Sequence, residues 1–129
     1  MESKNKQPFL SINRLKQSFV YALQGIRFTW KREQNFRIHT VISVLVLVIA
    51  QLLQIPFQEQ LILVIVIGAV LGMELINTAL EHVVDLVVQT YDDRAKVIKD
   101  TAAGAVFVFS ITAAIIGMMI FIPHVLKWF

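Results

Sequence analysis

The sequence predicts an all-α integral membrane protein in which one amphipathic surface helix precedes three transmembrane helices, in a single domain of 129 residues. Hydrophobic residues make up 57% of the chain and charged residues only 16%, a composition that a water-soluble globule of this size does not have. Three long apolar segments alternate with short polar ones. One of these segments also carries a regular row of polar side chains, which are costly to place in a membrane.

The N-terminal region predicts a retained, polar N-terminus and then a surface helix. Residues 1–7 lack the apolar stretch of a cleavable signal peptide. A helix is expected over residues 11–31 with Ser11 as its N-cap, because apolar residues recur at steps of three and four between basic ones. This helix is either an anchor alone or a binding surface. Arg14 and Tyr21 lie on its polar side and would suit a phosphate and a nucleoside.

Three apolar segments are long enough to cross the hydrocarbon core, which requires about 20 helical residues. They cover residues 38–55, 61–88 and 102–125. The second segment is longer than a bilayer requires, so its end is expected to project into water. A short turn joins the first two spans, and residues 91–100 are expected to form a polar connection between the second and third.

The distribution of Lys and Arg predicts the orientation of the chain in the membrane. Eight of the twelve precede the first span, none lies in the first connection, three lie in the second connection and one lies at the C-terminus. Cytoplasmic segments are enriched in such cations, so the N-terminus and the second connection are expected in the cytoplasm. The chain has no cysteine, which excludes disulfides and thiolate metal sites.

A polar stripe is predicted on the second span, formed by Glu74, Asn77, Glu81 and Asp85. Their spacing places them on one face of a helix, within about 80° of one another. Glu74 lies deepest in the apolar layer, and an acid at such a depth usually faces the protein interior and serves a function. Glu81 and Asp85 are expected nearer the cytoplasmic headgroups, together with Glu33 and Lys99.

The chemistry of this stripe allows three interpretations. The chain has no P-loop and no dinucleotide fingerprint. Acids and bases near the interface can nevertheless hold Mg²⁺ with a polyphosphate, and a separate acid in the apolar layer would suit removal of a proton from a lipid alcohol. The same residues would also fit an ion- or proton-conducting oligomer, or a structural polar seam in a scaffold or accessory subunit.

The motifs resemble those of the prokaryotic diacylglycerol kinase and undecaprenol kinase family. The central match is to E-x-x-N-[ST]-A-[IL]-E-x-x-x-D, which begins at Glu74 and ends at Asp85. Further matches follow in order at Gly25-Ile26-Arg27, Trp30, residues 33–37 and residues 95–106. The resemblance covers most of the chain, from about Arg14 to Val106.

The resemblance implies a homotrimer in the bacterial inner or plasma membrane, with active sites shared between neighbouring protomers. It implies that the γ-phosphoryl group of ATP is transferred to a lipid alcohol with Mg²⁺ as the cofactor. Residues 35–39 and 102–106 look more like the Gram-positive branch of the family, and residues 92–98 depart from the proteobacterial pattern. Undecaprenol is therefore expected as the acceptor, with diacylglycerol as the alternative.

The resemblance also assigns roles by position. Glu74 is expected as the general base with Asn77 beside it, and Glu33 and Glu81 as the metal-binding pair. The expected nucleotide contacts are Arg14, Tyr21, Glu33, Glu81, Thr90, Tyr91, Asp92, Lys99 and Asp100. The expected lipid contacts are Asn35, Phe36, Arg37, Ile38, His39, Leu52, Gln60, Glu74 and Ala103. Apart from the resemblance, Asp85 is expected as a solvated charge at the end of the stripe, with metal binding as the alternative. Asp92 and Asp93 are expected as solvated loop charges, with nucleotide contact as the alternative, and Lys96 as a partner of lipid headgroups.

Overall fold

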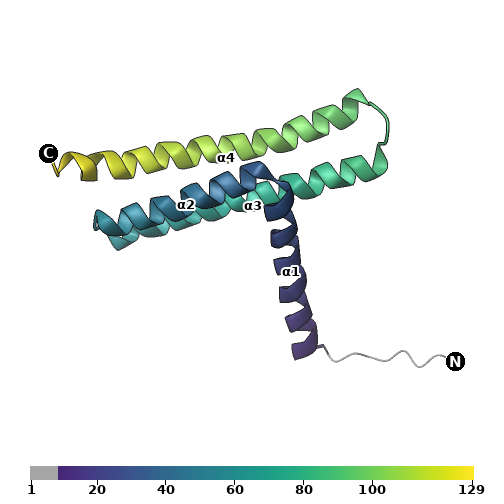
Figure 1. Ribbon diagram of the computed structural model, residues 1–129, viewed down its shortest axis with the longest axis horizontal. Coiled ribbons are helices and arrows are strands. Elements are labelled where there is room, and N and C mark those ends of the chain that lie inside the picture. The colour runs from purple at the N-terminus through teal and green to yellow at the C-terminus, as the bar shows by residue number, and fades with distance from the viewer. Residues whose placement is uncertain (1–8) are drawn as a thin grey trace.

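The computed structural model describes residues 9–129, which form four α-helices. These are α1 (Ile12–Arg32), α2 (Gln34–Leu52), α3 (Phe57–Val87) and α4 (Asp93–Leu126). Helices α2, α3 and α4 run alongside one another, and α1 runs crosswise to them (Figure 1). The expectation for the polar N-terminus over residues 1–7 falls outside the described residues.

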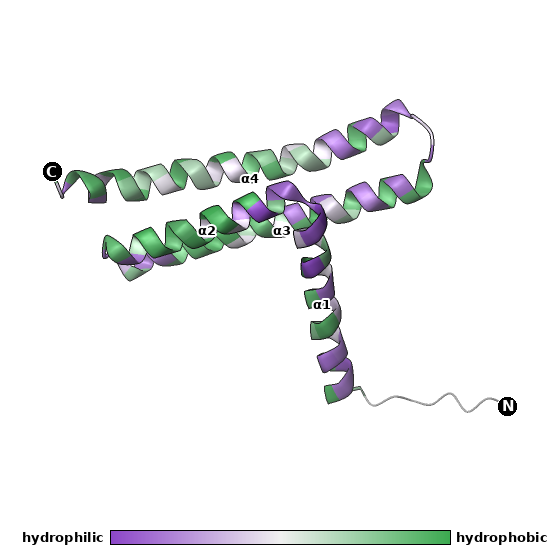
Figure 2. Cartoon of the chain, viewed as in Figure 1, coloured by the Kyte–Doolittle hydropathy of each residue, from purple (hydrophilic) through white to green (hydrophobic). Residues whose placement is uncertain are grey.

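Helices α2, α3 and α4 are each long and apolar enough to cross a membrane, which confirms the predicted number of spans within the described residues. At 1.5 Å per residue, α3 and α4 extend about 46 Å and 51 Å, well beyond a hydrocarbon core of about 30 Å. Hydrophilic residues gather where α3 ends and α4 begins, and along α1 (Figure 2). The extra helical length therefore lies at the polar end of the molecule.

Helix α4 begins at Asp93, inside the segment expected to be a polar connection over residues 91–100. Asp92 is its N-cap residue, and the Asp92 carboxylate accepts a hydrogen bond from the backbone N–H of Arg94 at 2.7 Å. Lys96 and Asp100 then form an ion pair one helical turn apart. The polar connection expected over residues 91–100 is therefore mostly helical, because capping and charge pairing stabilise a helix that continues beyond the apolar residues.

A single residue, Glu33, separates α1 from α2. Its backbone is extended, with φ −101° and ψ 113°, so the chain changes direction there. The Arg37 side chain donates hydrogen bonds to the carbonyl oxygens of Trp30 and Lys31, at 2.9 Å and 3.2 Å. Because the last carbonyls of a helix lack partners within the helix, these bonds cap the end of α1 and hold the corner.

Helix α1 is attached to α3 by an aromatic contact. The rings of Phe28 and His82 lie edge to face with their centroids 5.1 Å apart, and the Arg32 guanidinium lies 5.8 Å from the centroid of Phe28. At the other end of α1, the Ser11 hydroxyl accepts a hydrogen bond from the Arg14 backbone N–H at 3.5 Å, which confirms Ser11 as the N-cap. The contact with His82 keeps α1 against the middle of the bundle.

The hydrophobic core lies at the opposite end of the bundle from the polar residues. Its buried members are Ala50, Ile55, Leu63 and Ile120. The turn from α2 to α3 closes this end through Gln54, which has φ 53° in the left-handed region. The Gln54 N–H donates to the Gln51 carbonyl at 3.1 Å, and the Ile55 N–H donates to the Ala50 carbonyl at 3.0 Å. This is the Schellman arrangement, and it brings Ile55 onto the core.

The chain covers little of its own apolar surface. In their most hydrophobic windows, only 11% of α2, 22% of α3 and 11% of α4 is buried. Apolar faces of this extent are unfavourable in water. They require lipid or further protein around them, so this is a membrane protein.

Candidate functional site

Glu74 is the buried acid at the centre of the candidate site. It is 4% exposed, and its Oε1 has no hydrogen-bond partner among the described residues. His39 of α2 faces it, with 3.7 Å between His39 Nε2 and Glu74 Oε1. Glu33 and Glu81 also act on the Glu74 carboxylate electrostatically. The corner between α1 and α2 therefore brings one acid, Glu33, to the stripe on α3.

Asn77 and Glu81 form the next part of the stripe. Asn77 Nδ2 donates a hydrogen bond to Glu81 Oε1 at 3.0 Å, while Asn77 Oδ1 is buried without a partner among the described residues. This bond fixes the Glu81 carboxylate about two helical turns from Glu74 along one face of α3. Two members of the polar stripe predicted from the sequence are thus joined directly to each other.

The acids at this corner have the right chemistry for a magnesium ion, although the chain does not supply a complete ligand set. In residues 9–129, no group of three or more His, Cys, Asp or Glu side chains is placed to hold a metal ion. Glu33 makes no side-chain capping bond at the start of α2, so its carboxylate is not used there. Mg²⁺ commonly takes one or two carboxylates and completes its shell with phosphate oxygens and water. Glu33 and Glu81 fit such a role, and their assignment stays a prediction.

The residues expected to bind the nucleotide lie in three places. Glu33 and Glu81 are near Glu74. Arg14 lies in the first turn of α1, which Figure 1 shows far from the start of α4, and Tyr21 lines a cavity of about 540 Å³ between α1 and α3. The remaining candidates are at the polar end of the α3–α4 hairpin: Thr90, Tyr91, Asp92, Lys99 and Asp100. One chain therefore does not bring Arg14 to Lys99.

Two of the hairpin candidates are held by ion pairs. Lys99 Nζ donates to Asp85 Oδ1 at 2.6 Å, a contact that joins α4 to α3. Asp100 pairs with Lys96 on the exposed surface of α4. Asp85 and Lys96 are thus charge partners of the hairpin, and a phosphate that approached Lys99 would compete with Asp85.

The connection between α3 and α4 carries two shifted pKa values. The Tyr91 hydroxyl donates to Asp93 Oδ1 at 2.8 Å, and this bond raises the pKa of Tyr91 above its ordinary value. The Arg94 side chain lies 3.0 Å from Asp92 Oδ2 and, with its backbone N–H, holds the pKa of Asp92 below its ordinary value. Asp92 and Asp93 are therefore structured parts of the start of α4, although Asp93 is exposed as expected.

The residues expected to line the lipid path separate into two groups. Residues 35–39 occupy the first turns of α2 beside Glu74, where Phe36 is buried, Arg37 caps α1 and His39 faces the acid. Leu52 ends α2 and Gln60 lies in the first turn of α3, at the end of the bundle away from Glu74. Leu52 is 72% exposed, and Gln60 makes hydrogen bonds to Gln51 and to the Ile55 carbonyl. Ala103 is exposed on α4.

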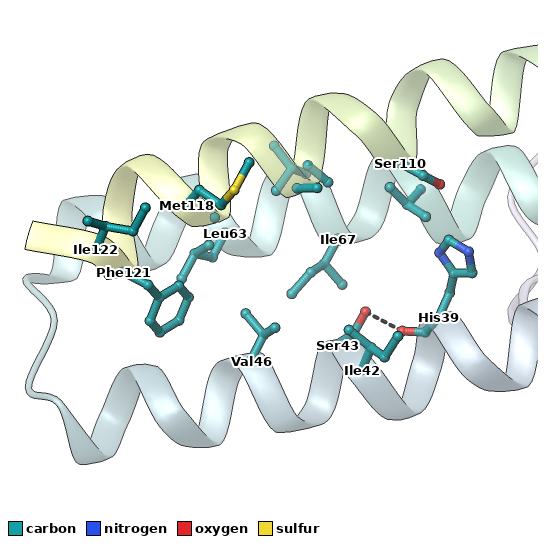
Figure 3. Close-up of a pocket in the computed structure, with 15 residues that line it drawn as sticks. His39, Ile42, Ser43, Val46, Leu63, Ile67, Ser110, Met118, Phe121 and Ile122 are labelled. Atoms are coloured by element: carbon teal, nitrogen blue, oxygen red, sulfur yellow. Dashed lines mark hydrogen bonds between the residues drawn. The ribbon is translucent and has the colours of Figure 1, made fainter. Parts of the chain in front are cut away.

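An apolar cavity of about 480 Å³ between α2, α3 and α4 was not predicted from the sequence. It extends from His39 and Ser110 at one end to Phe121 and Ile122 at the other (Figure 3). The only signal for this cavity in the sequence was Ser110, a polar residue in the apolar part of the last span. That signal is weak, because a serine in an apolar helix usually bonds to a carbonyl of its own helix.

Comparison with known proteins places these features in a family. The chain matches the family model described as prokaryotic diacylglycerol kinase over residues 20–121, which include all of α2 and α3. An undecaprenol kinase of Bacillus subtilis (strain 168) is 41% identical over 95% of this chain and 98% of the relative. A diacylglycerol kinase of Synechocystis sp. is 43% identical over 85% of this chain and 63% of the relative. A diacylglycerol kinase of Escherichia coli (strain K12) is 30% identical over 81% of this chain and 85% of the relative. The chain belongs to the prokaryotic diacylglycerol kinase family.

Proposed function

We propose that this chain is a membrane lipid kinase that transfers the γ-phosphoryl group of Mg-ATP to a lipid alcohol, with undecaprenol as the acceptor. The observation that carries the proposal is Glu74, a buried acid in a membrane-spanning helix. One of its oxygens has no hydrogen-bond partner among residues 9–129, and it lies within electrostatic reach of Glu33 and Glu81. The match to an undecaprenol kinase over nearly the whole of both chains supports the acceptor. Diacylglycerol is the second candidate, because two other relatives are diacylglycerol kinases.

In this proposal Glu74 accepts the proton of the lipid hydroxyl while the hydroxyl oxygen attacks the γ-phosphorus. The bond between the γ-phosphorus and the β,γ-bridging oxygen breaks, ADP leaves and the lipid becomes a phosphate monoester. Such a transfer depends mainly on positioning and charge neutralisation. His39 orients the Glu74 carboxylate from 3.7 Å. Glu33 and Glu81 would hold Mg²⁺, which neutralises phosphate charge when bound.

We further propose that α1 lies in the cytoplasmic interface of the cell membrane and that three copies form a trimer with shared active sites. The crosswise direction of α1 and its hydrophilic residues support the interfacial position (Figures 1 and 2). The excess of cations before α2 supports the orientation. The separation of Arg14 from Lys99 in one chain supports a nucleotide site completed by a neighbouring copy, and the uncovered faces of the spanning helices leave room for one.

The test compares three acid-to-amide variants in an assay with labelled ATP, offering undecaprenol and diacylglycerol side by side. Glu74→Gln should abolish turnover and leave Mg-ATP binding nearly unchanged, because it removes the proton acceptor. Glu33→Gln and Glu81→Gln should weaken Mg²⁺-dependent nucleotide binding. Glu59→Gln is the matched control, since Glu59 lies on the same helix at the end away from the site.

Three results would contradict the proposal. Full turnover by Glu74→Gln would remove its assigned role, and loss of ATP binding together with turnover would show that Glu74 serves nucleotide binding instead. Ion flux through the purified protein across sealed vesicles, without ATP consumption, would favour a conducting oligomer over a kinase.

A further inference from the structure

The cavity between α2, α3 and α4 is apolar along most of its length and polar at one end. Its walls include Val46, Leu63, Ile67 and Phe121. At the polar end of the cavity lie His39 and Ser110, which Figure 3 shows on facing helices. His39 lines the cavity and also lies 3.7 Å from Glu74, so the polar end adjoins the proposed general base.

Ser110 differs from the other hydroxyl residues of the helices. Within residues 9–129, every other helical Ser or Thr donates a hydrogen bond to the carbonyl four residues earlier, at 2.7 to 3.1 Å. Ser110 makes no such bond, and its Oγ is buried without a hydrogen-bond partner in the part of the chain that the structure describes. A buried hydroxyl without a partner costs free energy, so this group is free to bond to a ligand.

We propose that the cavity binds the apolar chain of the lipid alcohol and that Ser110 positions its hydroxyl group beside His39 and Glu74. The inference rests on the proposed lipid kinase activity and adds the path of the lipid chain through the protomer. An alcohol both donates and accepts hydrogen bonds. It can donate to Glu74 Oε1 and accept from Ser110 Oγ, which satisfies two buried oxygens that lack partners in the described residues.

The shape of the cavity also indicates the class of substrate. Its single polar end and apolar walls suit a long single-chain alcohol with a terminal hydroxyl, such as a polyprenol. Water is a poor occupant, because most of the wall offers it no hydrogen-bond partner. The wall shares His39 with the lipid contacts expected from the family resemblance, but it includes none of Leu52, Gln60 and Ala103.

Ser110→Ala removes the hydroxyl without adding bulk. We expect the KM for the lipid alcohol to rise roughly 2- to 12-fold, the range given by one ordinary hydrogen bond, with the KM for ATP unchanged. Ser110→Thr should restore the lipid KM because it keeps a hydroxyl. Thr112→Ala is the matched control, since its hydroxyl bonds to the Val108 carbonyl of the same helix at 2.9 Å. An unchanged lipid KM, or an equal effect of Thr112→Ala, would overturn the role of Ser110.

Gly117→Leu tests the path of the chain. Gly117 lines the cavity about 10 Å beyond Ser110 along α4, and a Cβ at this position meets no atom within 4 Å, so a side chain can start there without a backbone clash and narrow the space. We expect binding and kcat/KM for a long polyprenol to fall roughly tenfold, since about two methylene groups lose their apolar contacts. A short prenol whose chain ends before Gly117 should be unaffected. Ile115→Phe adds bulk to an exposed position of α4 outside the cavity and should spare both substrates.

Equal effects on long and short alcohols would overturn the inference. So would a change in oligomer mass and thermal stability for Gly117→Leu without a change in lipid binding, because the cavity would then receive a second copy of the chain. Alcohol binding measured without ATP separates the two proposals. A chain-length effect on binding by a wild-type protein that phosphorylates no lipid would refute the kinase activity and leave the cavity assignment intact.

Discussion

The bond from Asn77 to Glu81 gives the sharpest test of how the acidic stripe works. Asn77→Ala removes the donor that lies 3.0 Å from Glu81 Oε1. A hydrogen bond to a charged group contributes about 1.5 to 3 kcal/mol, and the half-buried position of both residues argues for the lower value. Because 1.36 kcal/mol corresponds to a tenfold change, we expect the Mg²⁺ concentration for half-maximal activity to rise about 12-fold.

The assay measures lipid phosphorylation against Mg²⁺ concentration at fixed ATP, with thermal unfolding in detergent as the control for stability. A double-mutant cycle separates the possible roles of Asn77. If Asn77 acts by orienting Glu81, the variant that combines Asn77→Ala with Glu81→Gln should be no worse than Glu81→Gln alone. Effects that multiply, or an Asn77→Ala variant with unchanged Mg²⁺ dependence, would refute this reasoning.

Two further predictions concern the ends of the bundle. Gln54 has φ 53°, a conformation that costs a residue other than glycine about 1 to 2 kcal/mol. Gln54→Gly should therefore raise the free energy of unfolding by about 0.5 to 1 kcal/mol, after the greater backbone entropy of glycine in the unfolded chain is subtracted. A destabilised variant in a reversible unfolding experiment would show that the Gln54 side chain matters more than this strain. The pKa of Asp92 lies below its ordinary value because the Arg94 side chain donates a hydrogen bond to its carboxylate. The carboxylate therefore stabilises the start of α4 fully at a pH above the ordinary pKa, and this stabilisation is lost as the pH falls through the lowered pKa. After correction for the intrinsic exchange rate at each pH, the protection of the first-turn amides of α4 should therefore fall in acid for the wild type and stay nearly constant over the same pH range for Asp92→Asn. Parallel protection curves would contradict the assignment.

Much of the fold could be predicted because it depends on local properties. The three spans follow from long apolar runs, and the N-cap at Ser11 follows from one side chain and the turn after it. The start of α4 is also local, since Asp92 caps it, yet it was missed because polar residues beyond a membrane span form either a helix or a loop. The capping pattern of Asp92 was the signal that separates these outcomes.

The candidate site divides along similar lines. The common face of Glu74, Asn77 and Glu81 depends only on helical spacing, so the bond between the last two agrees with the sequence. The contact between His39 and Glu74 joins two helices and cannot be read from either alone. The positions expected at Leu52 and Gln60 lie far from Glu74 along the bundle, and their part in lipid binding stays a prediction.

The sequence by itself determined which segments can enter a membrane and which helical face carries the acids, because both depend on residue order and helical period. The tertiary structure decided what those acids face. How α2 and α4 lie against α3 depends on contacts between the helices, such as the packing around Leu63 at the far end of the bundle and the ion pair between Lys99 and Asp85. Only such contacts bring His39 to Glu74 and leave the hydroxyl of Ser110 at the end of an apolar cavity.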